Sequence, residues 1–536
     1  MKNKVTKEKI IIILIIIIAI FSRTYQWPNT INGINCDEAM TAINAKSIAE
    51  TGKDIYGTSL PVYFETWLVS GQSALLTYLI ALCIKIFGFS IFSVRLPMLL
   101  MSIWSLYVFY KLVKLIFNDN KIAIISLFIV AINPWHIMQS QWALDCNTFP
   151  HFMLFSIYVL VKGFKQGKTA LIYLSMILFG VTTYSYGISL YFIPIFLSIL
   201  MISAIKNKKI RFKQVVICAI IVILVTLPLI LMSFINLLGM DSIKIGPITI
   251  QNFRYNVRTN DMLIFSDNII AQLFKNLRTL LKLLILNYDG LVFNAIPYIG
   301  TIYMGSIILV VLGICKLCKK ESKKIEYKNV ILIWIIIAII VGVLINDINI
   351  NRINIIWYPM IMLIGFGIYT LLDKCKFDKK MITIIIVFYM VMYILFNMIF
   401  HTSHHEEIEN SWVWSQGLEK AIKDATDTEK QIVLDESIGD IGKNVILSIY
   451  AIDYKFEEYG FIPKGVLINT YILEDNSELF QEVMLKNNIQ IKKIEIKEED
   501  FEKTYITNSR YGYELEDNLE YEIKYFNSFC VITKKE

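Results

Sequence analysis

Long apolar runs alternate with short polar segments through most of the chain, as far as about residue 400. The first run, Ile10–Phe21, is almost entirely isoleucine. About eleven of these runs are long enough to cross a bilayer as helices. The pattern therefore predicts an all-α polytopic membrane domain over residues 1–400, with spans near residues 9–25, 95–116, 121–138, 147–162, 169–186, 188–205, 214–234, 297–317, 329–346, 352–372 and 381–400.

Lysine clusters between the runs predict the orientation of the domain, because cytoplasmic loops carry an excess of lysine and arginine. With the N-terminus inside, every cluster falls on the cytoplasmic side and the C-terminus lies outside. The clusters are Lys2–Lys9, Lys111–Lys121, Lys162–Lys168, Lys206–Lys213, Lys316–Lys328 and Lys374–Lys380.

Residues 72–90 are apolar enough to form another span. Counting them as one would place the Lys111–Lys121 cluster outside and reverse every later cluster. We therefore predict a helix lying in the outer interface, with the Lys85 ammonium extending to water.

This topology places loop 26–94, loop 235–296 and the tail 401–536 outside the membrane. The tail alternates strand-like runs, such as Gln431–Leu434, Val445–Tyr450 and Gly465–Ile468, with helix-like stretches at 411–424 and 477–485. We expect a small extracytoplasmic α/β domain there.

Composition supports a multi-pass protein of the cell membrane, since 56% of residues are hydrophobic and the mean hydropathy is +0.55. The net charge of +7 does not indicate nucleic-acid binding, because the basic residues fall between apolar runs. The spacing of the eight cysteines is not that of a disulfide framework. The motif Cys315-x-x-Cys318 lies at the end of an apolar helix beside lysines, which does not favour a metal or redox role. The abundance of Ile, Lys and Asn is typical of an AT-rich bacterial genome.

The acidic pair Asp37-Glu38 follows the first span and is the first candidate for catalysis. Asn35 can cap a helix that begins here, with Glu38 three residues on as in a capping box. The pair could equally serve only the helix dipole. Its position at the membrane surface, where few other acids lie outside, favours a general base.

Asp145 is the second candidate, in the segment from Gln139 to Asn147 between two spans. A carboxylate at membrane depth is costly and is often functional, although Asp145 could also simply cap the next helix. Two carboxylates from separate loops that face one cleft would suit acid–base chemistry.

Basic residues on the outer side are few and are candidates for binding a lipid phosphate, since guanidinium pairs with phosphate through two hydrogen bonds. Each could instead anchor a helix end to lipid head groups. They are Arg95, Arg254, Arg258, Lys275, Arg278 and Arg352. The run His404–Glu407 is more typical of a solvated linker than of a metal site.

The chain resembles the membrane glycosyltransferases of the C-type fold. It is most similar to the family 39-like group, which includes protein O-mannosyltransferases and the aminoarabinose lipid A transferases. The resemblance rests on Asp37-Glu38-Ala39, then on Asp54 and Tyr56, on the string from Leu75 to Pro97 that contains Phe87-Gly88-Phe89-Ser90, and on Leu144-Asp145. It implies a polyprenyl-phosphate-linked sugar as donor and transfer on the outer face. Asp37 would take the place of the acceptor-activating carboxylate and Asp145 that of the second acid.

One segment departs from the family pattern. Ser70-Gly71-Gln72-Ser73 stands where the aminoarabinose transferases have Glu-Lys-Pro, so a phosphate-binding lysine and a metal-binding glutamate are missing. Dependence on a divalent metal is left open. Gln72, Tyr56 and Trp142 complete the expected contacts with substrate or phosphate.

The sequence thus predicts a glycosyltransferase of the cell envelope that acts on an acceptor glycan, lipid or protein. One alternative is a transporter or flippase of lipid-linked intermediates, which would be expected to place charges within its spans. Another is a membrane anchor for an outer domain that senses wall polymers. The sugar and the acceptor are not identified.

Overall fold

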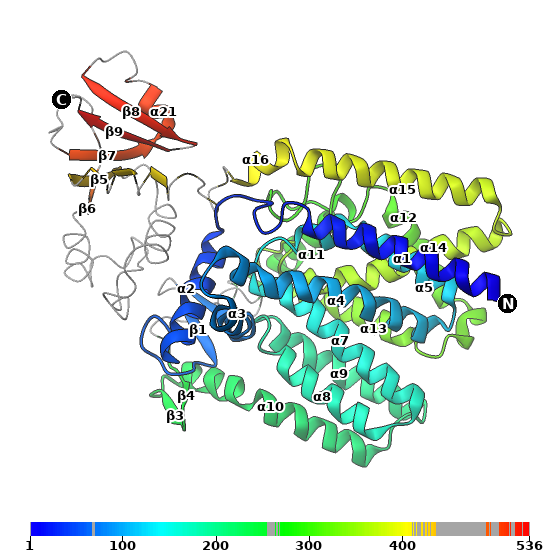
Figure 1. Cartoon of the computed structure of the whole chain (residues 1–536). Coiled ribbons are helices and arrows are strands. Elements are labelled where there is room, and N and C mark those ends of the chain that lie inside the picture. Colours follow the sequence, from blue (N-terminus) through cyan, green and yellow to red (C-terminus); the bar gives the residue numbers. More distant parts are fainter. Residues whose placement is uncertain are drawn as a thin grey trace.

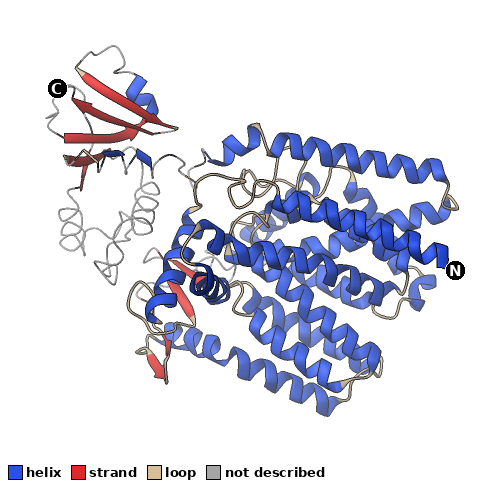
Figure 2. Ribbon diagram, viewed as in Figure 1, coloured by secondary structure: helices blue, strands red, loops and turns tan. Residues whose placement is uncertain are grey.

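The structure is a computed structural model that describes residues 2–66, 70–253, 263, 266 and 268–409, together with parts of the C-terminal region. Those parts are residues 411, 414, 417, 420–421, 424–425, 427–428, 430–435, 489–492, 494, 503–513, 515, 520–527 and 529–534. Figure 1 shows a bundle of long helices. Among the described residues, Figure 2 shows strands in hairpins at one end of this bundle and in the C-terminal sheet.

Each predicted span corresponds to a helix of the bundle. In chain order these helices are α1 (Lys2–Thr24), α4 (Ile91–Phe117), α5 (Asn120–Ala131), α7 (Asp145–Gln166), α8 (Thr169–Thr182), α9 (Ser189–Lys206), α10 (Phe212–Leu238), α12 (Ser306–Cys318), α13 (Lys328–Val343), α14 (Trp357–Lys374) and α15 (Lys379–Phe400). A short helix, α6 (Pro134–Met138), completes the third predicted span.

Five of the described helices are long and apolar enough to cross a membrane by length and composition alone. These are α4, α9, α10, α15 and the helix formed by η4 (Asn354–Ile356) with α14. The apolar helices α5, α8, α12 and α13 are shorter. The chain is thus a mostly helical, multi-pass membrane protein, and the number of eleven crossings stays a prediction.

Residues 26–94 form the end of the bundle opposite the N-terminus, which we call the site end (Figure 1). This segment contains α2 (Cys36–Thr51), the hairpin β1 (Tyr63–Thr66) and β2 (Ser70–Ser73), and α3 (Ala74–Phe87). Figure 1 views α3 end-on, so this helix runs across the direction of its long neighbours. That direction agrees with the surface helix expected for residues 72–90.

The segment between α10 and α12 also carries local structure. It contains the hairpin β3 (Ile243–Ile245) and β4 (Ile248–Ile250), followed by the amphipathic helix α11 (Ile269–Leu286). The hairpin contacts the site end, because Ser59 Oγ donates to the carbonyl of Pro247 over 2.9 Å. Arg254 and Arg258 lie outside the described residues.

The C-terminal region contains a five-stranded mixed sheet in the order β6-β5-β7-β9-β8. The strand β5 (Gln431–Asp435) is the predicted run Gln431–Leu434, whereas the predicted strands 445–450 and 465–468 lie outside the described residues. The other elements are α16 (Ser403–Glu409), β6 (Ile489–Lys492), β7 (Lys503–Asn508), α21 (Ser509–Tyr513), β8 (Tyr521–Phe526) and β9 (Phe529–Lys534).

Glycines allow the helices at the centre of the bundle to pack backbone to backbone. A Cβ added to Gly313 of α12 would lie 2.6 Å from the carbonyl oxygen of Leu363 in α14. A Cβ on Gly367 of α14 would collide with the carbonyl of Leu309 in α12. Small residues are favoured between membrane helices for this reason, since they allow close van der Waals packing.

We predict that Gly367→Ala destabilises the bundle, because the obstructing atom is a helix carbonyl that cannot turn aside. Overpacking of this kind costs about 1–3 kcal/mol. Thermal unfolding of the purified protein in detergent should show a lower Tm than wild type. Gly187→Ala is the control, because the nearest atom to its added Cβ is the Tyr63 hydroxyl at 3.7 Å. Equal Tm values for the two variants would contradict this account of the packing.

Candidate functional site

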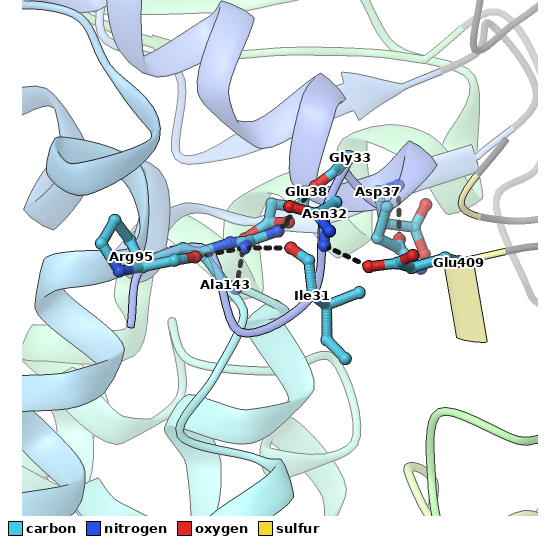
Figure 3. Close-up of polar contacts among 10 residues, drawn as sticks. Ile31, Asn32, Gly33, Asp37, Glu38, Arg95, Ala143 and Glu409 are labelled. Atoms are coloured by element: carbon cyan, nitrogen blue, oxygen red, sulfur yellow. Dashed lines mark hydrogen bonds and ion pairs between the residues drawn. The ribbon is translucent and has the colours of Figure 1, made fainter. Parts of the chain in front are cut away.

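A buried ion pair between Glu38 and Arg95 joins α2 to α4 at the site end (Figure 3). Arg95 Nε donates to Glu38 Oε1 and Arg95 Nη2 donates to Glu38 Oε2, each over 2.9 Å. The Glu38 side chain is 0% exposed and the Arg95 side chain is 1% exposed. Two parallel hydrogen bonds between guanidinium and carboxylate make a geometrically specific contact.

The remaining donors of Arg95 bind the loop that precedes α2. Nη1 donates to the carbonyls of Pro28 and Ile31, and Nη2 donates to that of Gly33. All five N–H groups of this guanidinium therefore have protein acceptors. Arg95 was predicted to bind phosphate. In this arrangement its contacts favour holding the loop in place, and the phosphate contact stays a prediction.

Glu38 also fixes the loop that leads into α7. Its Oε1 accepts a hydrogen bond from the backbone N–H of Ala143 over 2.8 Å. The carboxylate thus joins α2, α4 and the residues just before Asp145. We use the name Glu38 clasp for Glu38, Arg95 and the backbone groups that they bind. The predicted catalytic role of Glu38 stays untested, while its contacts favour holding its neighbours in place.

Asp37 lies beside the clasp but has a different environment. It is exposed, in the first turn of α2, and its backbone N–H donates to the Asn35 side chain over 2.9 Å. Figure 3 shows the Glu38 side chain turned toward Arg95 and that of Asp37 turned away, on the side of Glu409. Glu409 in turn accepts from the backbone N–H of Asn32 over 2.8 Å.

The neighbouring thiol of Cys36 is a poor nucleophile. Burial raises its pKa well above the ordinary value, and the nearby charge of Asp37 raises it further. The thiol therefore stays protonated at neutral pH.

Strand β2 brings the starts of α2 and α7 together. Gln72 Nε2 donates to the carbonyl of Asp37 over 2.9 Å, and the Thr41 hydroxyl donates to Gln72 Oε1 over 3.1 Å. The next residue, Ser73, donates its backbone N–H to Asp145 Oδ2 over 3.0 Å. Two consecutive residues of β2 thus contact Asp37 and Asp145, two of the three predicted catalytic residues. The side-chain amide of Gln72 is engaged with the start of α2.

Asp145 is the first residue of α7 and is partly exposed. The cap position is Leu144, so Asp145 does not cap the helix as its alternative role required. Two helix N-termini, each with an acid in its first turn, converge on β2. Backbone N–H groups at such ends attract negative charge, including phosphate.

Two other predicted contact residues lie around this centre. Tyr56 sits in a loop that Asp54 organises, since Asp54 Oδ1 accepts from the backbone N–H groups of Tyr56 and Thr58. Trp142 is fully buried and packs edge-to-face against Trp414, with ring centroids 5.3 Å apart. Its rings are therefore covered by protein in this arrangement.

Arg352 lies in the loop between α13 and η4 and is partly exposed. Its Nη1 donates to the carbonyl of Asn346 over 2.5 Å. Lys275 and Arg278 are exposed on α11.

A buried polar network was missed in the sequence. Arg23, at the end of α1, donates through Nη2 and Nε to His136 Nδ1 and binds the carbonyls of Ala19, Val130 and Ala131. His136 Nε2 lies 3.0 Å from the Tyr358 hydroxyl, which lies 2.8 Å from His151 Nδ1. Both histidines are buried and hydrogen-bonded within this network. An arginine closing an apolar run was the signal that could have revealed the network.

Metal binding has no evident site in the part of the chain that the structure describes. Among those residues, no group of three His, Cys, Asp or Glu converges so as to hold a metal ion. Instead, His404 Nδ1 lies 3.0 Å from Glu407 Oε2, and His404 Nε2 donates to the carbonyl of Val292 over 2.7 Å. The His404–Glu407 run thus makes contacts within α16 and with the segment that contains Val292.

Part of the chain is similar in sequence to a known protein family. Residues 72–232 match a family model described as dolichyl-phosphate-mannose-protein mannosyltransferase. This stretch contains Gln72, Arg95, Trp142 and Asp145 but neither Asp37 nor Arg352. No curated protein matches the chain in sequence.

Solved structures share the fold over nearly the whole chain. ArnT from Cupriavidus metallidurans in the apo state is 10% identical, with a TM-score of 0.54 and coverage of 99% of this chain and 98% of ArnT. The same enzyme bound to undecaprenyl phosphate gives a TM-score of 0.52, with 10% identity and coverage of 98% and 97%.

The oligosaccharyltransferase AglB from Archaeoglobus fulgidus, in complex with an inhibitory peptide and a dolichol-phosphate, is 12% identical with a TM-score of 0.51. The match covers 94% of this chain and 70% of AglB. The chain therefore has the C-type fold of membrane glycosyltransferases, and its resemblance to the group of protein O-mannosyltransferases and aminoarabinose transferases is confirmed.

Proposed function

We propose that the protein transfers a sugar from a polyprenyl-phosphate donor to an acceptor hydroxyl on the outer face of the membrane. The observation that carries the proposal is the junction at β2, where Gln72 and Ser73 tie the exposed acid Asp37 to the partly exposed acid Asp145. This junction occurs in a chain with the glycosyltransferase fold, at the end of the bundle formed by residues 26–94.

In the proposed reaction, the acceptor oxygen bonds to the anomeric carbon as the bond from that carbon to the phosphate oxygen breaks. The hydroxyl proton moves to the Asp37 carboxylate, and polyprenyl phosphate departs with the electron pair. Because phosphate is already a good leaving group, the protein mainly accepts the proton and stabilises the phosphate charge.

The other residues would support these two tasks. Asp145 would orient the acceptor or share the proton, and the Glu38 clasp would hold the helices that carry both acids. Arg352, a partly exposed residue, is the proposed contact for the donor phosphate. Trp142 would lie farther from the reacting atoms, since it packs against Trp414, and Tyr56 remains a proposed substrate contact.

The donor class is supported by similar structures rather than by a bound ligand. ArnT is described with undecaprenyl phosphate and AglB with a dolichol-phosphate. By analogy, a polyprenyl-phosphate-linked sugar would be the donor here. The acceptor would be a protein, lipid or glycan of the cell envelope, and dependence on a divalent metal stays open.

We predict that Asp37→Asn abolishes most transfer while leaving the fold intact. Asparagine keeps the shape and the helix cap but cannot accept the proton, and loss of a positioned general base costs roughly 100- to 10,000-fold in rate. Transfer of radiolabelled sugar from the polyprenyl-phosphate donor to membrane acceptors would be measured at matched expression.

Asp241→Asn serves as the control, because Asp241 is an exposed acid of another loop. Near-normal turnover of Asp37→Asn would refute its role as base. A collapse confined to Asp145→Asn would transfer that role to Asp145.

We predict that Glu38→Gln acts through stability. The amide leaves Arg95 as a buried cation without its carboxylate, and breaking such a pair costs about 3–5 kcal/mol. The Tm should fall markedly in detergent, and activity should fall only as far as the folded fraction does. Arg95→Lys should behave similarly, because lysine cannot supply the five N–H donors.

The control is Glu50→Gln on the same helix. Glu50 is 51% exposed and lies 3.9 Å from Lys46, so its loss should cost only tenths of a kcal/mol. A Glu38→Gln protein with the wild-type Tm and no activity would instead make Glu38 a catalytic residue.

The predicted orientation can be tested with native thiols. Cys318 is exposed within the Lys316–Lys328 cluster and should face the cytoplasm. In intact cells, a membrane-impermeant maleimide should fail to label a variant that retains only Cys318, and should label it after the cells are opened. Asp241→Cys in the same background should be labelled in both conditions. Labelling of Cys318 in intact cells would overturn the topology.

A further inference from the structure

Helix α11 presents three different faces. Its sequence, Ile269–Leu286, contains three cations and no acidic residue. Residues three, four or seven positions apart share one side of a helix, which groups the side chains into a buried, an apolar and a cationic face.

The buried face fixes the depth of the helix. Asn276 is 2% exposed, and its Nδ2 donates to the carbonyl of Val343, the last residue of α13, over 2.9 Å. The same nitrogen lies 3.3 Å from Asn346 Oδ1. Leu280 and Leu283 are buried on this face. The middle of α11 therefore lies level with the end of a bundle helix.

The second face is apolar and lies open. Its members recur at helical spacing and are exposed by 69% at Ile270, 67% at Phe274 and 65% at Ile285. Leu277 and Leu281 lie between them and are also exposed. Water would be a costly environment for so large a continuous apolar surface.

The third face is a cationic stripe beside the apolar one. Lys275, Arg278 and Lys282 are spaced by three and four residues, and all three are exposed. A helix with an apolar face and a neighbouring basic face is typical of segments that lie in a membrane interface. Charge complementarity favours an anionic lipid surface there.

We propose that α11 lies in the plane of the membrane surface and binds anionic phospholipid head groups through Lys275, Arg278 and Lys282. The apolar face enters the boundary between head groups and acyl chains at the level of the α13 end. α11 is not among the described helices apolar enough to span, which agrees with an in-plane position.

This contact would also reach the donor side of the protein. Asn276 binds Asn346, and the carbonyl of Asn346 accepts from Arg352. Lipid bound to α11 would thus steady the loop that carries Arg352. The lipid interaction itself does not depend on the proposed glycosyl transfer.

The test uses the full-length protein in detergent, titrated with phosphatidylglycerol or phosphatidylcholine, with bound lipid counted by native mass spectrometry. The triple variant Lys275→Gln, Arg278→Gln, Lys282→Gln should bind phosphatidylglycerol roughly 100-fold more weakly. Each of the three lost cations would have contributed a comparable part of the attraction to the anionic head groups. Wild-type binding should weaken in high salt.

The control is Lys420→Gln, Arg510→Gln, Lys534→Gln, which removes the same charge from exposed residues of the C-terminal region. It should bind phosphatidylglycerol like the wild type. Equal binding of the two lipids, or unchanged phosphatidylglycerol binding by the α11 variant, would overturn the proposal. The proposal would also be overturned if the α11 variant lost binding of undecaprenyl phosphate but kept binding of phosphatidylglycerol, because the cations would then serve the donor lipid.

A second measurement avoids charge changes and their effect on folding. Leu281, which is 51% exposed, would be replaced by photo-leucine in the otherwise unchanged chain in phosphatidylglycerol nanodiscs. Irradiation should yield an adduct with the mass of a lipid. A peptide adduct, or no lipid adduct, would show that protein or water covers this face and would refute the in-plane position.

Discussion

The Glu38 clasp determines where the other groups of the site can lie. Removing a carboxylate and a guanidinium from water is costly, and their mutual attraction offsets the cost only with good geometry and full hydrogen bonding. Here two parallel hydrogen bonds, three loop carbonyls and one backbone N–H complete the pair. Because these partners come from α2, α4 and two loops, none of these segments can shift without leaving a buried charge unpaired.

The same requirement explains the interior of the bundle. Polar backbone and side-chain groups at membrane depth must find partners within the protein. Arg23 does so through three carbonyls and His136, which links it to Tyr358 and His151. Asn354 performs a comparable task, accepting from Trp135 Nε1 and donating to Asn147 Oδ1. These contacts fix α6 and the start of α7, and therefore also the segment that ends at Asp145.

Periodicity and charge predicted the helices well, because apolar length is a local property of the sequence. Residues 72–90 show this clearly, since lysine parity indicated a surface helix and α3 runs across its neighbours. The acids Asp37 and Asp145 were also visible, as isolated charges beside apolar runs. The roles of Arg95 and Glu38 were not, because their contact joins residues 57 positions apart. An arginine that opens a span looks the same in sequence whether it binds phosphate or five protein acceptors.

The dipeptide Asp37-Glu38 shows where such reasoning stops. On a helix, adjacent residues point about 100° apart, so two acids in one turn can meet different surroundings. Glu38 faces Arg95 and is 0% exposed, whereas Asp37 faces outward at the same helix end. A carboxylate whose oxygens are already bound cannot accept a substrate proton without breaking its contacts. The contacts of the buried acid therefore hold the start of α2 in place, while its neighbour is exposed at the same helix end, and only the three-dimensional arrangement distinguishes the two environments.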